Sequence, residues 1–159
     1  MDRVLTIGVY GWSPERWVAA LHDARCDLVV DIRARRGVRG REHVFANSKR
    51  LQAIVAEAGL RYVHLPVLAP SRATRDAQVA ADAVSKTAKR DRARLGDAFV
   101  AAYRAEVVDV FDWQVIIAEL AAAAPALLCV ERLPAACHRS IVAAELAAGV
   151  GCPVVDLVP

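Results

Sequence analysis

Residues 27–33 read Asp27-Leu28-Val29-Val30-Asp31-Ile32-Arg33, a nearly continuous apolar run with charged residues at its ends and one aspartate near its close. A strand that is apolar on both faces is typical of a parallel sheet covered by helices on both sides. Similar short runs occur at residues 4–9, 60–65, 126–131 and 153–157. These five runs predict the strands of one sheet.

Helical patterns separate the predicted strands. Ser13 and Pro14 follow the first run, and they are typical of an N-cap and a first helical position. A second amphipathic helix is expected from Asn47 or Ser48 to Gly59, and others at 95–107, 112–123 and 138–148. The alternation predicts a single α/β domain spanning residues 1–159. We expect a mainly parallel, Rossmann-like sheet of about five strands, in the order 3-2-1-4-5, with helices on both faces.

The composition is that of one globular domain. The chain has 159 residues, of which 56% are hydrophobic and 25% charged, and its net charge is +3. No apolar run reaches the roughly 18 residues that span a bilayer, and residues 1–8 lack a signal-peptide pattern. We therefore expect a cytoplasmic protein. Its four cysteines lack paired C-x-x-C spacing and are expected to be free thiols.

Polar side chains gather where the predicted strands end. In parallel α/β sheets, ligands bind beyond the carboxyl ends of the strands. The side chains at these ends are Tyr10 after the first strand, Asp31 and Arg33 on the second, His64 on the third, and Cys129 and Glu131 on the fourth. These residues predict a crevice at one edge of the sheet.

The turn after the fourth predicted strand leads into Cys137-His138-Arg139-Ser140. Amide groups at a helix start, beside an arginine, favour phosphate, sulfate or carboxylate. We expect Arg33 and Arg139 to bind an anion, while His138, Tyr10, Cys129 and His64 supply polar walls. Cys137 is the candidate nucleophile, and Asp31 and Glu131 are expected to orient arginine or to transfer a proton.

Structural roles compete with each of these assignments. Cys137 could face the core, and Arg139 could hold the turn by pairing with Glu131 or Asp31. Arginines more often hold such carboxylates in place than leave them to transfer protons. The Cys and His residues have no recognised metal-ligand spacing, so no metal or cofactor is predicted.

Four motifs, in this order, resemble an uncharacterised bacterial and archaeal family, domain of unknown function 488. They are Thr6-Ile7-Gly8, Asp31-Ile32-Arg33, Tyr62-Val63-His64-Leu65-Pro66, and Cys129-Val130-Glu131 followed by Cys137-His138-Arg139. The resemblance implies a cytoplasmic α/β domain without a settled activity. Relatives have His-Ser where this chain has Val9-Tyr10, and glycine in place of Ala69-Pro70, so a candidate acid/base or ligand histidine is missing at position 9.

Three functional hypotheses remain. The first is an enzyme-like domain that binds an anionic small molecule, such as a nucleotide or a phosphorylated or carboxylated metabolite. The second is a nucleic-acid-associated module that uses the basic stretches 33–41 and 72–94. The third is a partner-binding remnant of an enzyme. Residues 69–94 are expected to form either a mobile lid or an exposed helix.

Overall fold

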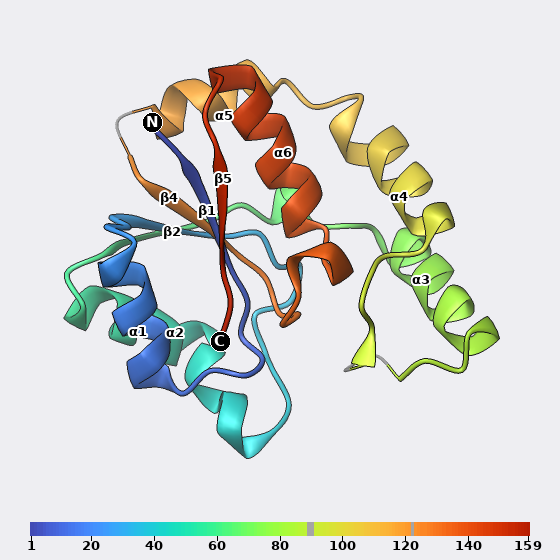
Figure 1. Ribbon diagram of the computed structural model, residues 1–159, viewed down its shortest axis with the longest axis horizontal. Helices are drawn as coiled ribbons and strands as arrows, with labels where there is room; N and C mark the ends of the chain where they lie inside the picture. Colours follow the sequence, from blue (N-terminus) through green and yellow to red (C-terminus); the bar gives the residue numbers. More distant parts are fainter. Residues whose placement is uncertain (89–90, 122) are drawn as a thin grey trace.

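The computed structural model covers the 159-residue chain and describes residues 1–88, 91–121 and 123–159. Its sheet has five strands, all parallel, in the order β3-β2-β4-β1-β5 (Figure 1). The strands are β1 (Val4–Ile7), β2 (Leu28–Asp31), β3 (Arg61–His64), β4 (Pro125–Leu128) and β5 (Val154–Leu157). The predicted α/β class and the five-stranded parallel sheet are confirmed.

The predicted strand order 3-2-1-4-5 is wrong in one respect, because β1 and β4 exchange places. β4 pairs with both β2 and β1, whereas β1 pairs with β4 and the edge strand β5. Both β1 and β4 are fully buried along their length, so their composition fits either central position equally well. The exchange brings the end of β4 directly beside the end of β2.

Two helices cover one face of the sheet. They are α1 (Pro14–Asp23) and α2 (Ser48–Glu57). Trp17 and Leu21 of α1, together with Leu51 and Val55 of α2, pack in one cluster with Leu5 and other strand residues. The hydroxyl of Ser13 accepts a hydrogen bond from the amide of Arg16, so the predicted cap forms. The apolar side of each helix thus covers this face of the sheet.

The opposite face is covered by α5 (Trp113–Leu120) and α6 (Arg139–Val150) (Figure 1). Ile116 of α5 and Val142 and Leu146 of α6 pack against Val4 and Leu127 in a second core cluster. Val4 and Leu5 therefore face opposite sides of the sheet, as expected for successive residues of a strand. α6 ends at Val150, and the capping residue Gly151 has a φ of 75°, the left-handed conformation that favours glycine at this position.

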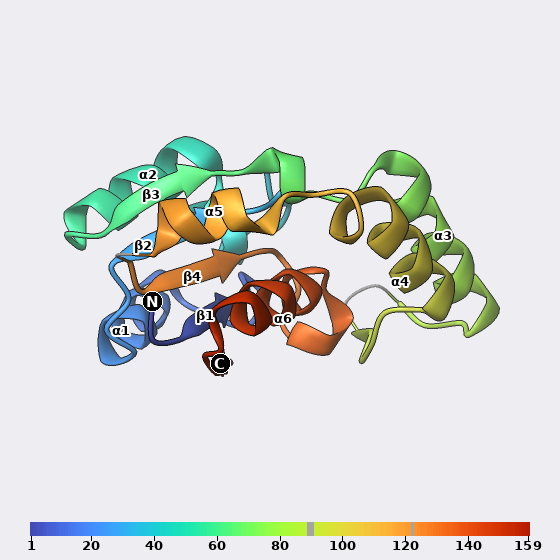
Figure 2. The same cartoon turned by 90° about the horizontal axis from the view of Figure 1, so that it is seen from above.

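In its described residues, the excursion between β3 and α5 contains the α-helices α3 (Arg72–Val84) and α4 (Asp97–Tyr103), and α4 continues into a π-helix at Arg104–Val108. Figure 2 shows this pair side by side, beyond the carboxyl ends of β1 and β4. Ser71 caps α3 by accepting from the amide of Thr74. Of the two alternatives for residues 69–94, the helix forms over residues 72–84, and residues 89 and 90 lie outside the described part of the chain.

Short 3-10 helices complete the chain at Arg41–Ala46, Pro66–Leu68 and Pro134–Ala136. Within the described ranges, none of the helices combines the length and apolarity needed to span a membrane.

Candidate functional site

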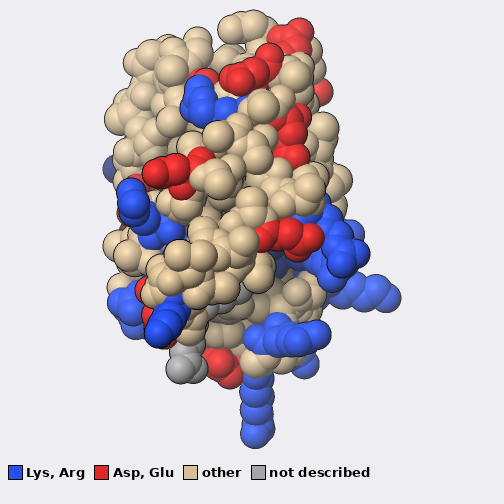
Figure 3. Space-filling model, turned by 90° about the vertical axis from the view of Figure 1, so that its right-hand side faces the viewer, with Lys and Arg blue, Asp and Glu red and all other residues tan. Residues whose placement is uncertain are grey.

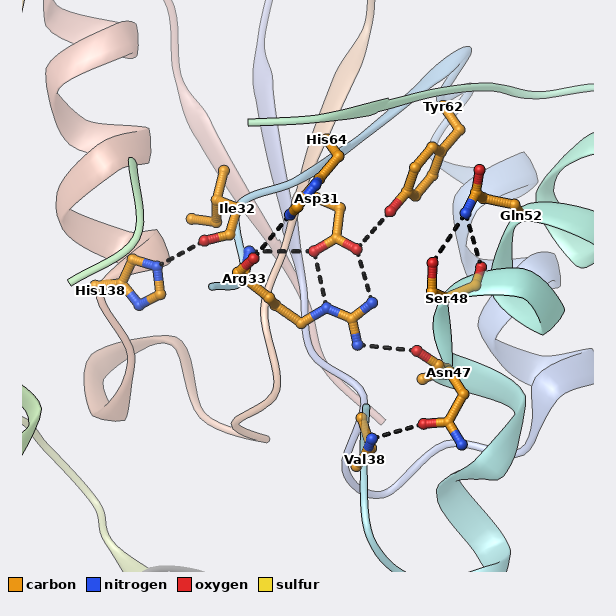
Figure 4. Close-up of polar contacts among 11 residues, drawn as sticks. Asp31, Ile32, Arg33, Val38, Asn47, Ser48, Gln52, Tyr62, His64 and His138 are labelled. Carbon is orange, nitrogen blue, oxygen red and sulfur yellow. Dashed lines mark hydrogen bonds and ion pairs between the residues drawn. The ribbon is translucent and has the colours of Figure 1, made fainter. Parts of the chain in front are cut away.

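A buried ion pair closes the end of β2. Nε and Nη2 of Arg33 donate to Oδ1 and Oδ2 of Asp31 at 2.8 and 2.7 Å, and Nη1 donates to the carbonyl of Ala46 at 3.0 Å (Figure 4). Asp31 is 0% exposed and Arg33 2% exposed. Every guanidinium nitrogen of Arg33 therefore donates to a protein acceptor, and the bidentate geometry is the strongest form of such a pair.

The neighbouring strand β3 completes this network. The Tyr62 hydroxyl donates to Oδ2 of Asp31 at 2.7 Å, and Nε2 of His64 lies 2.9 Å from the carbonyl of Arg33 (Figure 4). A carbonyl only accepts, so Nε2 of His64 carries the proton. Burial, followed by the bond to Asp31, raises the pKa of Tyr62 above its ordinary value. The network links the 33–41 loop to two strands.

Arg139, the second predicted anion ligand, is 0% exposed at the start of α6. Its Nη1 and Nη2 donate to the carbonyls of Glu131 at 2.6 Å and Arg132 at 3.1 Å. Its Nε donates to Oγ1 of Thr6 at 3.3 Å, and Thr6 donates to Asp156 at 2.6 Å. Arg139 thus ties the turn after β4 to β1 and β5.

Two thiol groups and one imidazole lie close together next to the turn that follows β4. Sγ of Cys129 lies 3.7 Å from Nδ1 of His138, and Sγ of Cys137 lies 3.9 Å from the same atom. The ligand atoms of all three side chains lie within 4.8 Å of one another, and all three residues are buried. Nε2 of His138 approaches the carbonyl of Ile32 at 3.4 Å (Figure 4). We call these three residues the Cys–His cluster.

The two thiols of the Cys–His cluster have opposite pKa shifts. Burial would raise the pKa of Cys137, but hydrogen bonds from Cys129 and His138, with the positive charges of His138 and Arg139, lower it well below its ordinary value. The hydrogen bond to Cys137, followed by burial, raises the pKa of Cys129. Of the two thiols, Cys137 therefore has the lower pKa and Cys129 the higher.

A cleft of about 310 Å³ opens at the same edge of the sheet. It is lined by residues of the turn after β4 and of the segment before α4, namely Asp91, Arg92, Glu131, Arg132 and Leu133. Arg132 is exposed, whereas Arg92 forms an ion pair with Asp82 of α3. A main-chain hydrogen bond connects the two segments near the cleft, because the amide of Leu95 donates to the carbonyl of Ala135 at 2.9 Å. Charged groups of both signs therefore line the cleft.

Most of the predicted site residues fall into two groups. Asp31, Arg33 and His64 share the β2–β3 network, while Cys129, Cys137 and His138 form the Cys–His cluster, and Ile32 joins the two groups. Glu131 lines the cleft. Tyr10 lies apart, with its ring 4.6 Å from the ring of His43.

Sequence reasoning missed three contributors. Tyr62 was noted only as part of a motif, yet it binds Asp31. Tyr103 of α4 packs its ring edge-on against His138, at 5.5 Å between centroids. Arg132 is the exposed cation of the cleft, and its position next to Glu131 was a usable signal.

The family described as domain of unknown function DUF488 matches residues 13–146. The chain belongs to this family. The matched range of the DUF488 domain contains Asp31, Arg33, the Cys–His cluster and the residues that line the cleft, whereas Thr6-Ile7-Gly8 lies before it. No curated protein and no solved structure matches the chain. Membership confirms the predicted resemblance, and the description of DUF488 assigns no activity.

The two predicted basic stretches differ in how far their arginines are engaged. Arg33 is buried, whereas Arg35, Arg39 and Arg41 are exposed. In the second stretch, Arg72 pairs with Asp76 at 3.7 Å and Arg92 with Asp82. Figure 3 shows the face that carries α3 and α4, with acidic side chains among the basic ones. This face is therefore not uniformly cationic.

Proposed function

We propose that this DUF488 protein is an enzyme-like domain that binds an anionic small molecule in the cleft beside the β4–α6 turn. The nucleotides and the phosphorylated or carboxylated metabolites are the ligand classes we favour. The observation that carries the proposal is the exposed guanidinium of Arg132 in a cleft of about 310 Å³ at the carboxyl edge of a parallel sheet.

Arg132, rather than Arg33 or Arg139, is the residue we assign to contact the anion. Arg33 and Arg139 are buried, and each of their guanidinium nitrogens already donates to a protein acceptor. Direct contact with a ligand would require them to exchange these partners. We therefore assign both a positioning role, in which Arg139 holds the main chain that presents Arg132.

The topology supports a ligand site at this edge. β1 leads to α1 on one face of the sheet, and its neighbour β4 leads to α6 on the opposite face. Their connections therefore diverge from adjacent strand ends, which is the arrangement beside which open α/β sheets bind ligands. The cleft is lined by the turn that leaves β4.

Among the three candidate catalytic residues, Glu131 alone lines the cleft. Asp31 is held by Arg33 and Tyr62, and Cys137 is 2% exposed. A carboxylate beside a guanidinium suits a ligand that carries both an anionic group and hydroxyl or amine donors, as a nucleotide does. Glu131 is accordingly our candidate for proton transfer.

Thermal unfolding in the presence of pyrophosphate, ADP, citrate and short DNA or RNA tests the proposal. We expect one class of small anion to raise the unfolding midpoint of the wild type and of Arg35→Ala, a matched exposed-arginine control. Arg132→Ala and Arg132→Glu should keep the wild-type midpoint without ligand and lose the response. An undiminished response in Arg132→Glu would overturn the assignment.

The nucleic-acid hypothesis predicts a different outcome of the same experiment. The exposed Arg35, Arg39 and Arg41 of the first basic stretch favour it. In that case DNA or RNA alone should stabilise the protein, in a salt-dependent manner, and Arg35→Ala should weaken the effect while Arg132→Ala does not. Stabilisation by neither class would favour the third hypothesis, a partner-binding remnant.

A further inference from the structure

The Cys–His cluster has a donor set that the proposed anion site does not use. Two thiol sulfurs and one imidazole nitrogen lie within 4.8 Å of one another, and Cys129, Cys137 and His138 are all buried. Cys26, by contrast, is a buried cysteine whose sulfur donates to the main-chain carbonyl of Leu28, as a packing residue does. Thiolate and imidazole are the ligands that zinc prefers.

We propose that Cys129, Cys137 and His138 bind one Zn²⁺ ion through the two Sγ atoms and Nδ1. In tetrahedral zinc sites the Zn–S and Zn–N bonds are about 2.3 and 2.0–2.1 Å, which places neighbouring sulfur and nitrogen ligands about 3.6 Å apart. The observed separations of 3.7 and 3.9 Å between Sγ and Nδ1 are close to this value. Small rotations of the side chains complete the geometry.

A hydrogen bond to the main chain orients the imidazole for this role. Nε2 of His138 faces the carbonyl of Ile32 at 3.4 Å, and because a carbonyl only accepts, Nε2 carries the proton. In the neutral ring that metal binding requires, the lone pair of Nδ1 is then directed at the two sulfurs. Zinc-binding histidines characteristically donate their second nitrogen to a carbonyl or carboxylate in this way. Tyr103 packs against the same ring and limits its rotation.

Charge balance also favours a metal ion in this buried position. Two thiolates carry two negative charges, which one Zn²⁺ neutralises while the two thiol protons leave for the solvent. The ligands come from rigid positions, since Cys129 directly follows β4 and His138 directly precedes α6. Three protein ligands is the number found in catalytic zinc sites, where the fourth position holds water or substrate.

Titration of the reduced wild-type protein with Co²⁺ tests this inference. We expect one Co²⁺ per chain, with thiolate-to-cobalt charge-transfer absorption and tetrahedral ligand-field bands that Zn²⁺ abolishes by displacement. The Cys26→Ser/Cys152→Ser variant, a matched control with the other two cysteines removed, should bind identically. Cys129→Ser, Cys137→Ser and His138→Gln should each weaken binding at least tenfold.

The wild-type spectrum decides the question even if the buried variants do not fold. Absence of thiolate-to-cobalt bands in the reduced wild type, or stoichiometric binding that survives Cys129→Ser with Cys137→Ser, would overturn the inference. Bands with Co²⁺ but displacement by Cu⁺ only would also overturn it as a zinc site. The inference is independent of the proposed anion cleft, since Arg132→Ala should leave Co²⁺ binding unchanged.

Discussion

Arg139 donates from Nη1 to the main-chain carbonyl of Glu131 at 2.6 Å, so a buried helix-start arginine holds the turn that follows β4. The same guanidinium binds the carbonyl of Arg132 and, through Thr6, reaches β1. The positions of Glu131 and Arg132, which line the cleft, therefore depend on Arg139, which does not line it. This relationship separates residues that position the site from residues that contact a ligand.

Replacement of Arg139 should destabilise the protein strongly. Arg139→Ala leaves the buried carbonyl of Glu131 without its donor and creates a cavity in the core, at a combined cost of about 3–5 kcal/mol. Arg139→Lys should recover less than half of this loss of stability. One ammonium group cannot reach all the acceptors that the planar guanidinium of Arg139 contacts. Urea unfolding measures both. Arg132→Ala is the control, and we expect a change within about 0.5 kcal/mol.

The Asp31–Arg33 pair should behave as a single buried unit. Asp31→Ala leaves the Arg33 charge without its partner in a buried position, at a cost of about 3–5 kcal/mol. Removing both charges in Asp31→Ala/Arg33→Met should cost less than the sum of the two single changes, since no unpaired charge is then left buried. A double-mutant cycle by urea unfolding measures the coupling. Strict additivity would show that the pair is not a unit.

Gly8 lies where β1 leaves the sheet and passes close to the β4–α6 turn. A Cβ atom at this position would lie 2.1 Å from the carbonyl oxygen of Glu131, a main-chain atom that cannot move away cheaply. Gly8→Ala should therefore lower the unfolding midpoint markedly and displace the cleft wall. Gly37→Ala is the matched control, because no atom lies within 4 Å of its added Cβ. Equal midpoints for the two variants would contradict the close approach.

Cys26 should make the stability depend on alkaline pH. Burial, helped by the negative charge of Asp27, raises the pKa of this thiol from 9.0 to about 11. Between these values the folded chain keeps the proton that the unfolded chain loses, so stability falls as pH rises. The fall is about 3 kcal/mol, since each pKa unit corresponds to about 1.4 kcal/mol, and Cys26→Ala should lack it. Parallel pH profiles for wild type and variant in urea unfolding would count against this assignment.

Much of the fold follows from local pattern. The apolar runs and helical stripes place the five strands and the helices that cover the sheet, because burial on both faces requires continuous apolar strands. These local patterns do not predict the exchange of β1 and β4. Each is buried along its length, and the crossover that decides between them depends on packing across the whole sheet.

In the candidate site, too, the sequence predicts contacts between residues that are near in the chain but not contacts between distant ones. Asp31 is the last residue of β2 and Arg33 follows two residues later, so their pairing is local and the sequence favours it. Cys129, Cys137 and His138 lack a recognised ligand spacing, because a loop and a 3-10 helix separate the first from the others. Only the turn of the chain brings their donor atoms together. Tyr103 reaches His138 from a helix whose position the sequence does not reveal.

The most direct test of the proposed function is a titration of the wild-type protein with ADP, followed by amide NMR spectra. Our account predicts saturable shifts that centre on Glu131, Arg132 and Leu133 and extend to Arg92 across the cleft. In Arg132→Ala these shifts should disappear while the rest of the spectrum stays that of the folded protein. Shifts confined to the exposed loop at residues 35–41, with none at Glu131 to Leu133, would contradict the account.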